Sequence, residues 1–132
     1  MKIGLIGYGK MGKAIERIAL ERGHSIVYKI DSKNTIDQVD LSAADVAIEF
    51  TQPELVVNHI ETCIEKQVPI VVGTTAWHNE LERVTKLVSD ENGSLLHASN
   101  FSVGVNILFN INEKLAALMS SHPEYKAQIE EI

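Results

Sequence analysis

The feature that most constrains the fold of this chain is the glycine-rich stretch at residues 2–12, KIGLIGYGKMG. The apolar run at 3–6 predicts a buried strand, which breaks at a turn. Helical spacing then places one apolar face on Met11, Ile15, Ile18 and Ala19. The glycines have the spacing G-x-G-x-x-G between a strand and a helix, which is typical of a dinucleotide-binding turn.

Each glycine of this motif has a physical task. The first permits the tight turn, the second lets the backbone approach a pyrophosphate, and the third lets the helix pack close to the strand. Backbone N–H groups at the start of the helix, with the positive end of its dipole, face an anionic ligand. The candidate pyrophosphate-binding residues are therefore Gly7, Tyr8, Gly9, Lys10 and Met11. The alternative is a tight turn that binds nothing.

An acidic residue at the end of the second predicted strand supports the first interpretation. Asp31 follows the apolar run 25–30 and lies 19 residues after Gly12. A carboxylate here accepts hydrogen bonds from an adenosine ribose and repels a 2′-phosphate. Lys33 is long enough to reach such a phosphate, so we expect NADH as cofactor, with NADPH possible. The alternative is an aspartate that only caps a turn.

Strand and helix patterns alternate along most of the chain. Apolar segments predict strands at 3–6, 25–30, 45–50, 69–72 and 94–98, and helical patterns occupy 53–66, 78–91 and 103–121. This order predicts an α/β fold, a Rossmann-like doubly wound parallel sheet. We expect the strand at 46–50 to lie beside the first strand, opposite 25–30, which places the ligand crevice between Gly7 and Phe50.

Several local predictions follow from shorter patterns. Thr51-Gln52-Pro53-Glu54 has the T-x-x-E form of a capping box. The segment between Asp31 and Asp45 is too short for a helix and a strand, so it holds either a vestigial strand around 35–36 or one helical turn. Glu49 is either a buried base or, as we expect, a solvated or hydrogen-bonded side chain near the crevice mouth.

The C-terminal part predicts the start of a second domain. The apolar positions of the helix at 103–121 have no evident cover, and alternation from Tyr125 to Glu131 predicts a single strand that has no sheet of its own. We therefore expect a dinucleotide-binding domain at 1–102 and an incomplete second domain at 103–132. The uncovered apolar surface predicts self-association, hence a homo-oligomer.

Composition excludes several classes of function. Twelve basic residues against 18 acidic ones give a net charge of −6, which argues against a nucleic-acid surface. No apolar stretch approaches the roughly 20 residues that span a bilayer, and no signal peptide is evident. The single cysteine, Cys63, predicts a core thiol in a reducing cytoplasm. Five scattered histidines lack metal-ligand spacing, so we expect no metal.

Two further turns are candidates for the nicotinamide end of the site, because each follows a predicted strand. Gly73, Thr74 and Thr75 follow the fourth strand and offer a close backbone approach with polar contacts. Ser99, Asn100 and Phe101 follow the fifth and combine an amide with an aromatic ring. Either turn could instead have a purely structural role.

Four stretches together resemble the dihydrodipicolinate reductase (4-hydroxy-tetrahydrodipicolinate reductase) family of bacterial lysine and diaminopimelate biosynthesis. They are the glycine loop at 9–12, IEFTQPE at 48–54, VGTT at 72–75 and NFSVGVN at 100–106. The resemblance covers essentially the whole chain but only the N-terminal part of the family's length. It implies an oxidoreductase that reduces a cyclic dicarboxylate with NAD(P)H and with loss of water.

Position by position, the resemblance implies that the loop from Gly7 holds the pyrophosphate and Asp31 the ribose. Phe50 and Thr51 then flank the cofactor, and the turns at 73–75 and 99–101 surround the nicotinamide. Ala76 stands where the family often has glycine, and Glu49 where aspartate is usual. The glycine loop is also often one residue longer in the family.

The largest departure concerns catalysis. The histidine pair, lysine and Pro-Ser-Gly-Thr segment that bind and reduce the substrate in the family do not occur before Ile132. The resemblance therefore implies no catalytic residue in this chain, and we expect it to bind cofactor without turnover. The alternatives are another NAD(P)-dependent oxidoreductase and a non-catalytic NAD(H)-sensing module.

Overall fold

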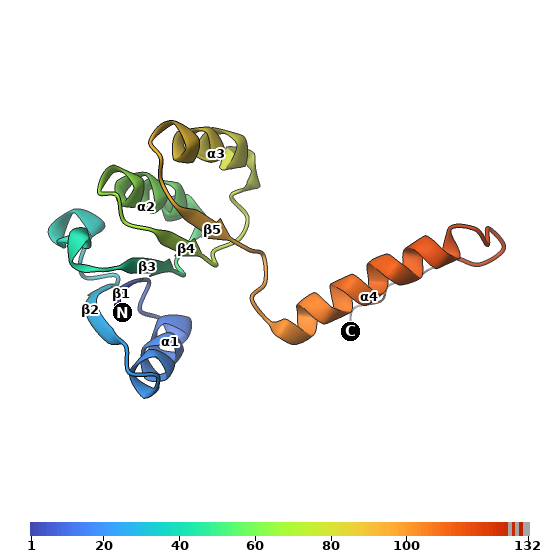
Figure 1. Cartoon of the computed structure of the whole chain (residues 1–132), viewed down its shortest axis with the longest axis horizontal. Helices are drawn as coiled ribbons and strands as arrows, with labels where there is room; N and C mark the ends of the chain where they lie inside the picture. The colour runs from blue at the N-terminus through green and yellow to red at the C-terminus, as the bar shows by residue number, and fades with distance from the viewer. Residues whose placement is uncertain (127, 129, 131–132) are drawn as a thin grey trace. The chain divides into compact units, whose positions relative to one another are not determined.

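A computed structural model describes residues 1–126, 128 and 130 of the 132-residue chain. The chain divides into two compact units, Met1–Ser99 and Asn100–Ile132. The first unit contains the strands β1 (Lys2–Ile6), β2 (Ser25–Ile30), β3 (Val46–Glu49), β4 (Ile70–Val72) and β5 (Leu95–His97). Its longer helices are α1 (Lys10–Glu21), α2 (Pro53–Glu65) and α3 (Leu81–Asp90). These elements are labelled in Figure 1.

The five strands form one parallel sheet in the order β2-β1-β3-β4-β5. This order confirms the Rossmann-like fold, including the predicted place of β3 beside β1 and opposite β2. Ile6, at the end of β1, pairs with Ile30 on one side and Glu49 on the other. The carboxyl ends of β2, β1 and β3 therefore lie side by side at one edge of the sheet, where open α/β sheets bind ligands.

Helices cover both faces of the sheet, with α1 on one face and α2 and α3 on the other (Figure 1). The face toward α1 has a small core in which Ala19 of the helix packs with Ile3 and Leu5. The prediction that Met11 and Ile18 belong to the buried stripe was wrong, because both side chains are exposed. The buried positions of α1 are Gly12 and Ala19, so the helix approaches the sheet through small residues.

The segment between β2 and β3 contains two short 3-10 turns, Ile36–Gln38 and Leu41–Ala43. Of the two predicted alternatives the helical one is correct, and the segment forms two such turns. Ile36 and Leu41 are buried and join the larger core on the α2 side of the sheet. The reduced connection thus still contributes apolar packing to this core.

The second unit contains one long helix, α4 (Val103–Met119). The Ser102 hydroxyl caps it by accepting a hydrogen bond from the Val105 N–H. No residue of this helix is buried, and its large apolar side chains are exposed at 103, 107, 108, 109, 111, 115 and 118. The predicted terminal strand includes residues 127, 129 and 131, which lie outside the described residues. In the described part of the chain, no helix is both long enough and apolar enough to cross a membrane.

Ala76, in the turn after β4, has a left-handed backbone conformation with φ of 66°. An L-residue in this conformation lowers the free energy of unfolding by about 1–2 kcal/mol. Glycine removes this strain, but part of the gain is lost because glycine raises the conformational entropy of the unfolded chain. We expect Ala76→Gly to raise Tm by about 2–4 °C in a thermal unfolding measurement. The matched control is Ala44→Gly, where φ is −98° and glycine should lower Tm. A lower Tm for Ala76→Gly would show that the backbone of Ala76 is not strained.

Cys63 is fully buried in α2, which confirms the predicted core thiol. Burial raises the pKa of this thiol to about 12. Because the thiolate is the reactive form, we expect negligible alkylation by iodoacetamide at pH 8 in the folded protein and complete alkylation in guanidinium chloride. Mass spectrometry measures both. Rapid alkylation of the folded protein would show that α2 opens.

Candidate cofactor cleft

An open cleft of about 780 Å³ lies at the carboxyl edge of the sheet, within the first unit. The loops after β1, β2 and β3 and the first turns of α2 form its walls. The cleft brings together five of the predicted cofactor residues: Gly7, Tyr8, Gly9, Asp31 and Thr51. A cavity is therefore present beside the ends of β1 and β3, where the crevice was predicted, and its volume is in the range of small-molecule sites.

The glycine turn depends on close backbone contacts. Gly7 has φ of 99°, and its N–H donates to the Ile30 carbonyl at 2.9 Å. A Cβ on Gly7 would lie 2.0 Å from the Phe50 carbonyl oxygen, and a Cβ on Gly12 would lie 2.2 Å from the Gly7 carbonyl oxygen. Gly7 thus makes the tight turn, and Gly12 lets α1 pack against it, as the motif predicts.

The N-terminus of α1 faces the motif with its amides uncovered by side chains. Its N-cap is Gly9, which has no capping side chain, and the first turn of the helix has no acidic residue. Lys10 and Met11 begin the helix, so their N–H groups have no partner within it. A Cβ built on Gly9 would meet nothing within 4 Å. These backbone donors and the helix dipole suit an anionic group such as a pyrophosphate.

Asp31 stands at the end of β2, on the cleft wall. Its carboxylate Oδ1 accepts a hydrogen bond from the Lys33 N–H at 2.8 Å, and its own N–H donates to Asn34 Oδ1 at 2.7 Å. Asn34 in turn donates to the Lys29 carbonyl at 3.0 Å. The carboxylate is exposed and held in a defined turn, which leaves lone pairs for ligand hydroxyl groups.

The Tyr8 side chain is held by charged neighbours on α1 and β2. Its hydroxyl donates to the Glu16 carboxylate, and Lys29 Nζ lies 4.6 Å from its ring centroid and 2.6 Å from Glu16 Oε1. The hydrogen bond with Lys29 lowers the pKa of the Glu16 carboxyl, and the same bond raises the pKa of Lys29. Both groups are charged at neutral pH, so the cation beside the glycine turn is already neutralised by a carboxylate.

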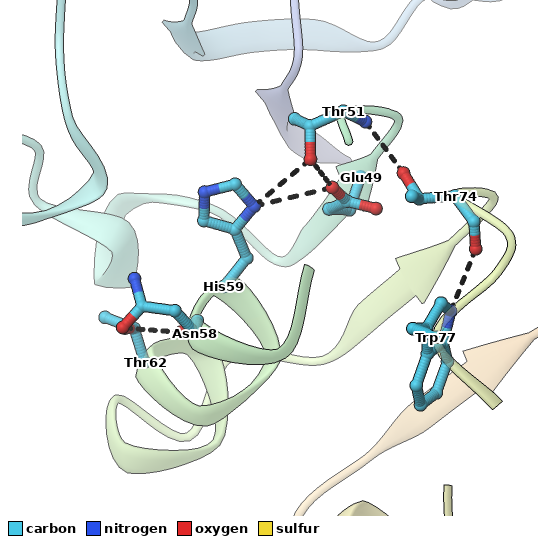
Figure 2. Close-up of polar contacts among 7 residues, drawn as sticks. All are labelled: Glu49, Thr51, Asn58, His59, Thr62, Thr74 and Trp77. Carbon is cyan, nitrogen blue, oxygen red and sulfur yellow. Dashed lines mark hydrogen bonds and ion pairs between the residues drawn. The ribbon is translucent and has the colours of Figure 1, made fainter. Parts of the chain in front are cut away.

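The capping-box prediction at Thr51 was wrong. Helix α2 begins at Pro53, its N-cap is Gln52, and no side chain caps it. The Thr51 hydroxyl instead donates to Glu49 Oε1, as Figure 2 shows. His59 Nδ1 lies 3.4 Å from that same oxygen. The T-x-x-E pattern does not form a capping box here, because the Thr51 hydroxyl is hydrogen-bonded to the buried Glu49 carboxylate two residues upstream.

Glu49 is hydrogen-bonded, as predicted, but it is fully buried and does not lie at the mouth of the crevice. Its Oε2 atom has no hydrogen-bond partner among the described residues. His59 Nδ1 faces the Glu49 Oε1 atom at 3.4 Å, and a ring N–H at that position would donate to it. Buried carboxylates are unfavourable unless such partners compensate for lost hydration.

Three other predicted residues lie around a second, much smaller pocket of about 10 Å³. Thr74, Thr75 and Ser99 line it together with Trp77, whose Nε1–H donates to the Thr74 carbonyl at 2.9 Å. A Cβ on Gly73 would lie 2.0 Å from the Phe50 ring, so this glycine allows close packing of that ring. Asn100 and Phe101 belong to the second unit.

Sequence reasoning missed part of the cleft wall. His59 and Asn58 of α2 line the cleft, and Thr35 and Asp37 contribute from the connection after β2. The only available signal for His59 was its place on the buried side of α2, between Val56 and Ile60. Among residues 1–126, 128 and 130, no group of three or more His, Cys, Asp or Glu side chains is placed to hold a metal ion.

The parallel sheet, the glycine turn and the cleft at the β1–β3 crossover define a Rossmann-like domain. Solved structures with this fold include aspartate semialdehyde dehydrogenase II from Vibrio cholerae, complexed with ASA, at a TM-score of 0.57 and 12% identity over 75% of this chain and 38% of that one. The WlbA dehydrogenase from Chromobactrium violaceum, in complex with NADH and UDP-GlcNAcA, also has a TM-score of 0.57, at 15% identity over 74% of this chain and 34% of that one.

The family is defined by sequence. Residues 1–101 match the family described as "Dihydrodipicolinate reductase, N-terminus". The chain belongs to the dihydrodipicolinate reductase family, and the matching region is its NAD(P)-binding domain.

Relatives named 4-hydroxy-tetrahydrodipicolinate reductase come from several bacteria. The one from Christiangramia forsetii is 41% identical over 134 residues, which cover 100% of this chain and 55% of the relative. The one from Neisseria gonorrhoeae is 35% identical over 107 residues, covering 80% of this chain and 39% of the relative. The chain thus spans about half, or less, of the curated relatives it matches.

Proposed function

We propose that this chain is the cofactor-binding part of an NAD(P)H-dependent reductase that converts 4-hydroxy-tetrahydrodipicolinate to tetrahydrodipicolinate in lysine and diaminopimelate biosynthesis. The observation that carries this proposal is the 41% identity to a relative of that name along the full length of this chain. The substrate is then a small cyclic dicarboxylate. The chain spans 55% of that relative, and we place the residues that bind and reduce the substrate in the remainder.

The cleft fits a dinucleotide in its shape and in its donor set. The α1 amides face the pyrophosphate position, and the bare Cα of Gly9 leaves room for it. Asp31 then accepts hydrogen bonds from the adenosine ribose, and Thr51 flanks the cofactor on the opposite wall. The turn with Thr74 and Thr75 supports the nicotinamide end.

The bound reduced nicotinamide supplies the hydride, which replaces the hydroxyl group lost as water from the substrate, with uptake of one proton. This chain's residues bind and orient the cofactor for that transfer. The Asp31 carboxylate favours a free 2′-hydroxyl over a 2′-phosphate, and Lys29, a cation beside the glycine turn, is paired with Glu16. We therefore propose NADH as the preferred cofactor and NADPH as a weaker ligand.

Two further proposals concern assembly and location. The apolar side chains exposed along α4 need a cover, which we propose is supplied within a homo-oligomer. The reaction uses a soluble nucleotide and a small acid, and the buried free thiol suits a reducing compartment, so we propose a cytoplasmic location. Analytical ultracentrifugation of the chain tests the first; a clean monomer at high concentration contradicts it.

Calorimetric titration tests the cofactor and the reaction separately. We expect the chain to bind NADH more tightly than NADPH, and to show no turnover when 4-hydroxy-tetrahydrodipicolinate is added. Absence of binding by either nucleotide at millimolar concentration contradicts the cofactor site. Turnover at an appreciable rate contradicts the placement of the catalytic residues outside this chain.

A further inference from the structure

A buried carboxylate joins three segments that meet beside the cleft. Glu49 ends β3 and is fully buried, and its Oε1 accepts from the Thr51 hydroxyl. His59 of α2 is almost as buried, and its Nδ1 lies 3.4 Å from Glu49 Oε1 and 3.5 Å from Thr51 Oγ1. A carboxylate loses its hydration when it is buried, whereas an apolar side chain of similar size would fill this position without that cost. The contacts that the Glu49 carboxylate makes therefore indicate a role beyond packing.

The hydrogen bonds continue from this cluster to the turn after β4. The Thr51 N–H donates to Thr74 Oγ1 at 2.8 Å, and the Thr74 carbonyl accepts from Trp77 Nε1 at 2.9 Å. Figure 2 shows the resulting chain of contacts from His59 to Trp77. Thr51 and His59 line the large cleft, whereas Thr74 and Trp77 line the small pocket. The network therefore connects the two parts of the predicted cofactor site.

We propose that Glu49 and His59 are positioning residues for the nicotinamide half of the cofactor. By holding the Thr51 side chain, they aim its backbone N–H at the Thr74 hydroxyl and so fix the turn that supports the nicotinamide. This inference rests on the proposed cofactor site. Glu49 does not line the cleft, so its influence on a ligand passes through Thr51 and His59.

The positioning role predicts different changes in affinity for two ligands that share all but one chemical group. NADH carries the nicotinamide, whereas ADP-ribose contains the adenosine, both riboses and the pyrophosphate without it. Loss of the network should weaken NADH and spare ADP-ribose. A purely structural role would weaken both ligands equally, and a direct contact of His59 with the adenosine half would do the same.

The experiment titrates both ligands calorimetrically into the wild-type chain and its variants. We expect His59→Leu to raise the Kd of NADH about tenfold, equivalent to one hydrogen bond with a charged partner, and that of ADP-ribose less than twofold. His59→Asn retains an amide near the position of Nδ1 and should restore NADH binding to within about threefold. The fluorescence enhancement of bound NADH should fall in His59→Leu, because the nicotinamide is less restrained.

Two further variants keep the test decisive. Glu49→Gln has the same shape and retains an acceptor for the Thr51 hydroxyl. Because an amide oxygen is a weaker acceptor than a carboxylate, this variant should raise the Kd of NADH about threefold. It replaces His59→Leu in the test if that variant does not fold. Val84→Ala is the control, because this apolar residue is fully buried in α3, a helix that contributes no residue to the network. It should lower Tm without changing the ratio of the two affinities.

Equal losses for NADH and ADP-ribose in the His59 and Glu49 variants would overturn the positioning role alone. A shifted affinity ratio in Val84→Ala would do the same. Failure of the wild-type chain to bind either ligand would instead overturn the proposed cofactor site, and this inference with it.

Discussion

The Gly7→Ala variant is expected to lose about 3–5 kcal/mol of unfolding free energy, because the new Cβ combines backbone strain with overpacking. Gly7 has φ of 99°, and the Cβ would lie 2.0 Å from the Phe50 carbonyl oxygen. That carbonyl cannot withdraw freely, since the Phe50 N–H donates to the Ile6 carbonyl at 2.8 Å within the sheet. The loss approaches the full stability of an ordinary domain.

Denaturant titration followed by the fluorescence of Trp77 measures this loss, because Trp77 is the single tryptophan and is buried in the first unit. The matched control is Gly23→Ala. Gly23 also has a positive φ, of 76°, but its Cβ would meet nothing within 4 Å. We expect a loss of about 1–2 kcal/mol there, from conformation alone. Equal losses at the two glycines would show that the contact with Phe50 relaxes.

The strands of the sheet were predictable because each is a short apolar run between turn signals. The G-x-G-x-x-G spacing located the tight turn at Gly7 and the close helix contact at Gly12, both of which the structure contains. Crossover rules for parallel sheets then placed β3 beside β1. The fold was therefore predicted from signals that depend on backbone geometry and on local periodicity.

The buried face of α1 was not predictable from apolarity alone. The helix packs through Gly12 and Ala19, because small residues permit a close approach to the sheet, and this rotates Met11 and Ile18 toward solvent. A periodicity argument gives weight to large side chains and therefore chooses the wrong face when the contact is made by small ones.

The polar network was hidden for a different reason. Thr51 satisfies a capping pattern in sequence, but its hydroxyl has two possible partners, the helix amides and Glu49. The choice depends on the burial of Glu49 and on His59, which lies ten residues further along the chain. Local patterns contain no information on such a contact, so the connection from the cleft to Thr74 could come only from the structure.

The Gly9→Ala variant is expected to show the opposite behaviour to Gly7→Ala: a loss of cofactor affinity with no loss of fold. The backbone of Gly9 is extended, with φ of −83° and ψ of −150°, and a Cβ there would meet no protein atom within 4 Å. The free energy of unfolding should therefore change by less than about 0.5 kcal/mol. The methyl group would instead project beside the α1 amides, where we place the pyrophosphate.

A pyrophosphate displaced by a methyl group loses charge-assisted hydrogen bonds to the backbone, so the Kd of NADH should rise by about 10–100-fold. ADP-ribose carries the same pyrophosphate and should lose affinity by the same factor. That parallel loss separates this effect from the selective loss of NADH expected when Thr74 is no longer held. Calorimetric titration of both ligands, with the Trp77 unfolding curve as the control for fold, measures both effects. Unchanged affinity in a folded Gly9→Ala protein would place the pyrophosphate away from the glycine turn, because no other residue shields that methyl group from a ligand bound there.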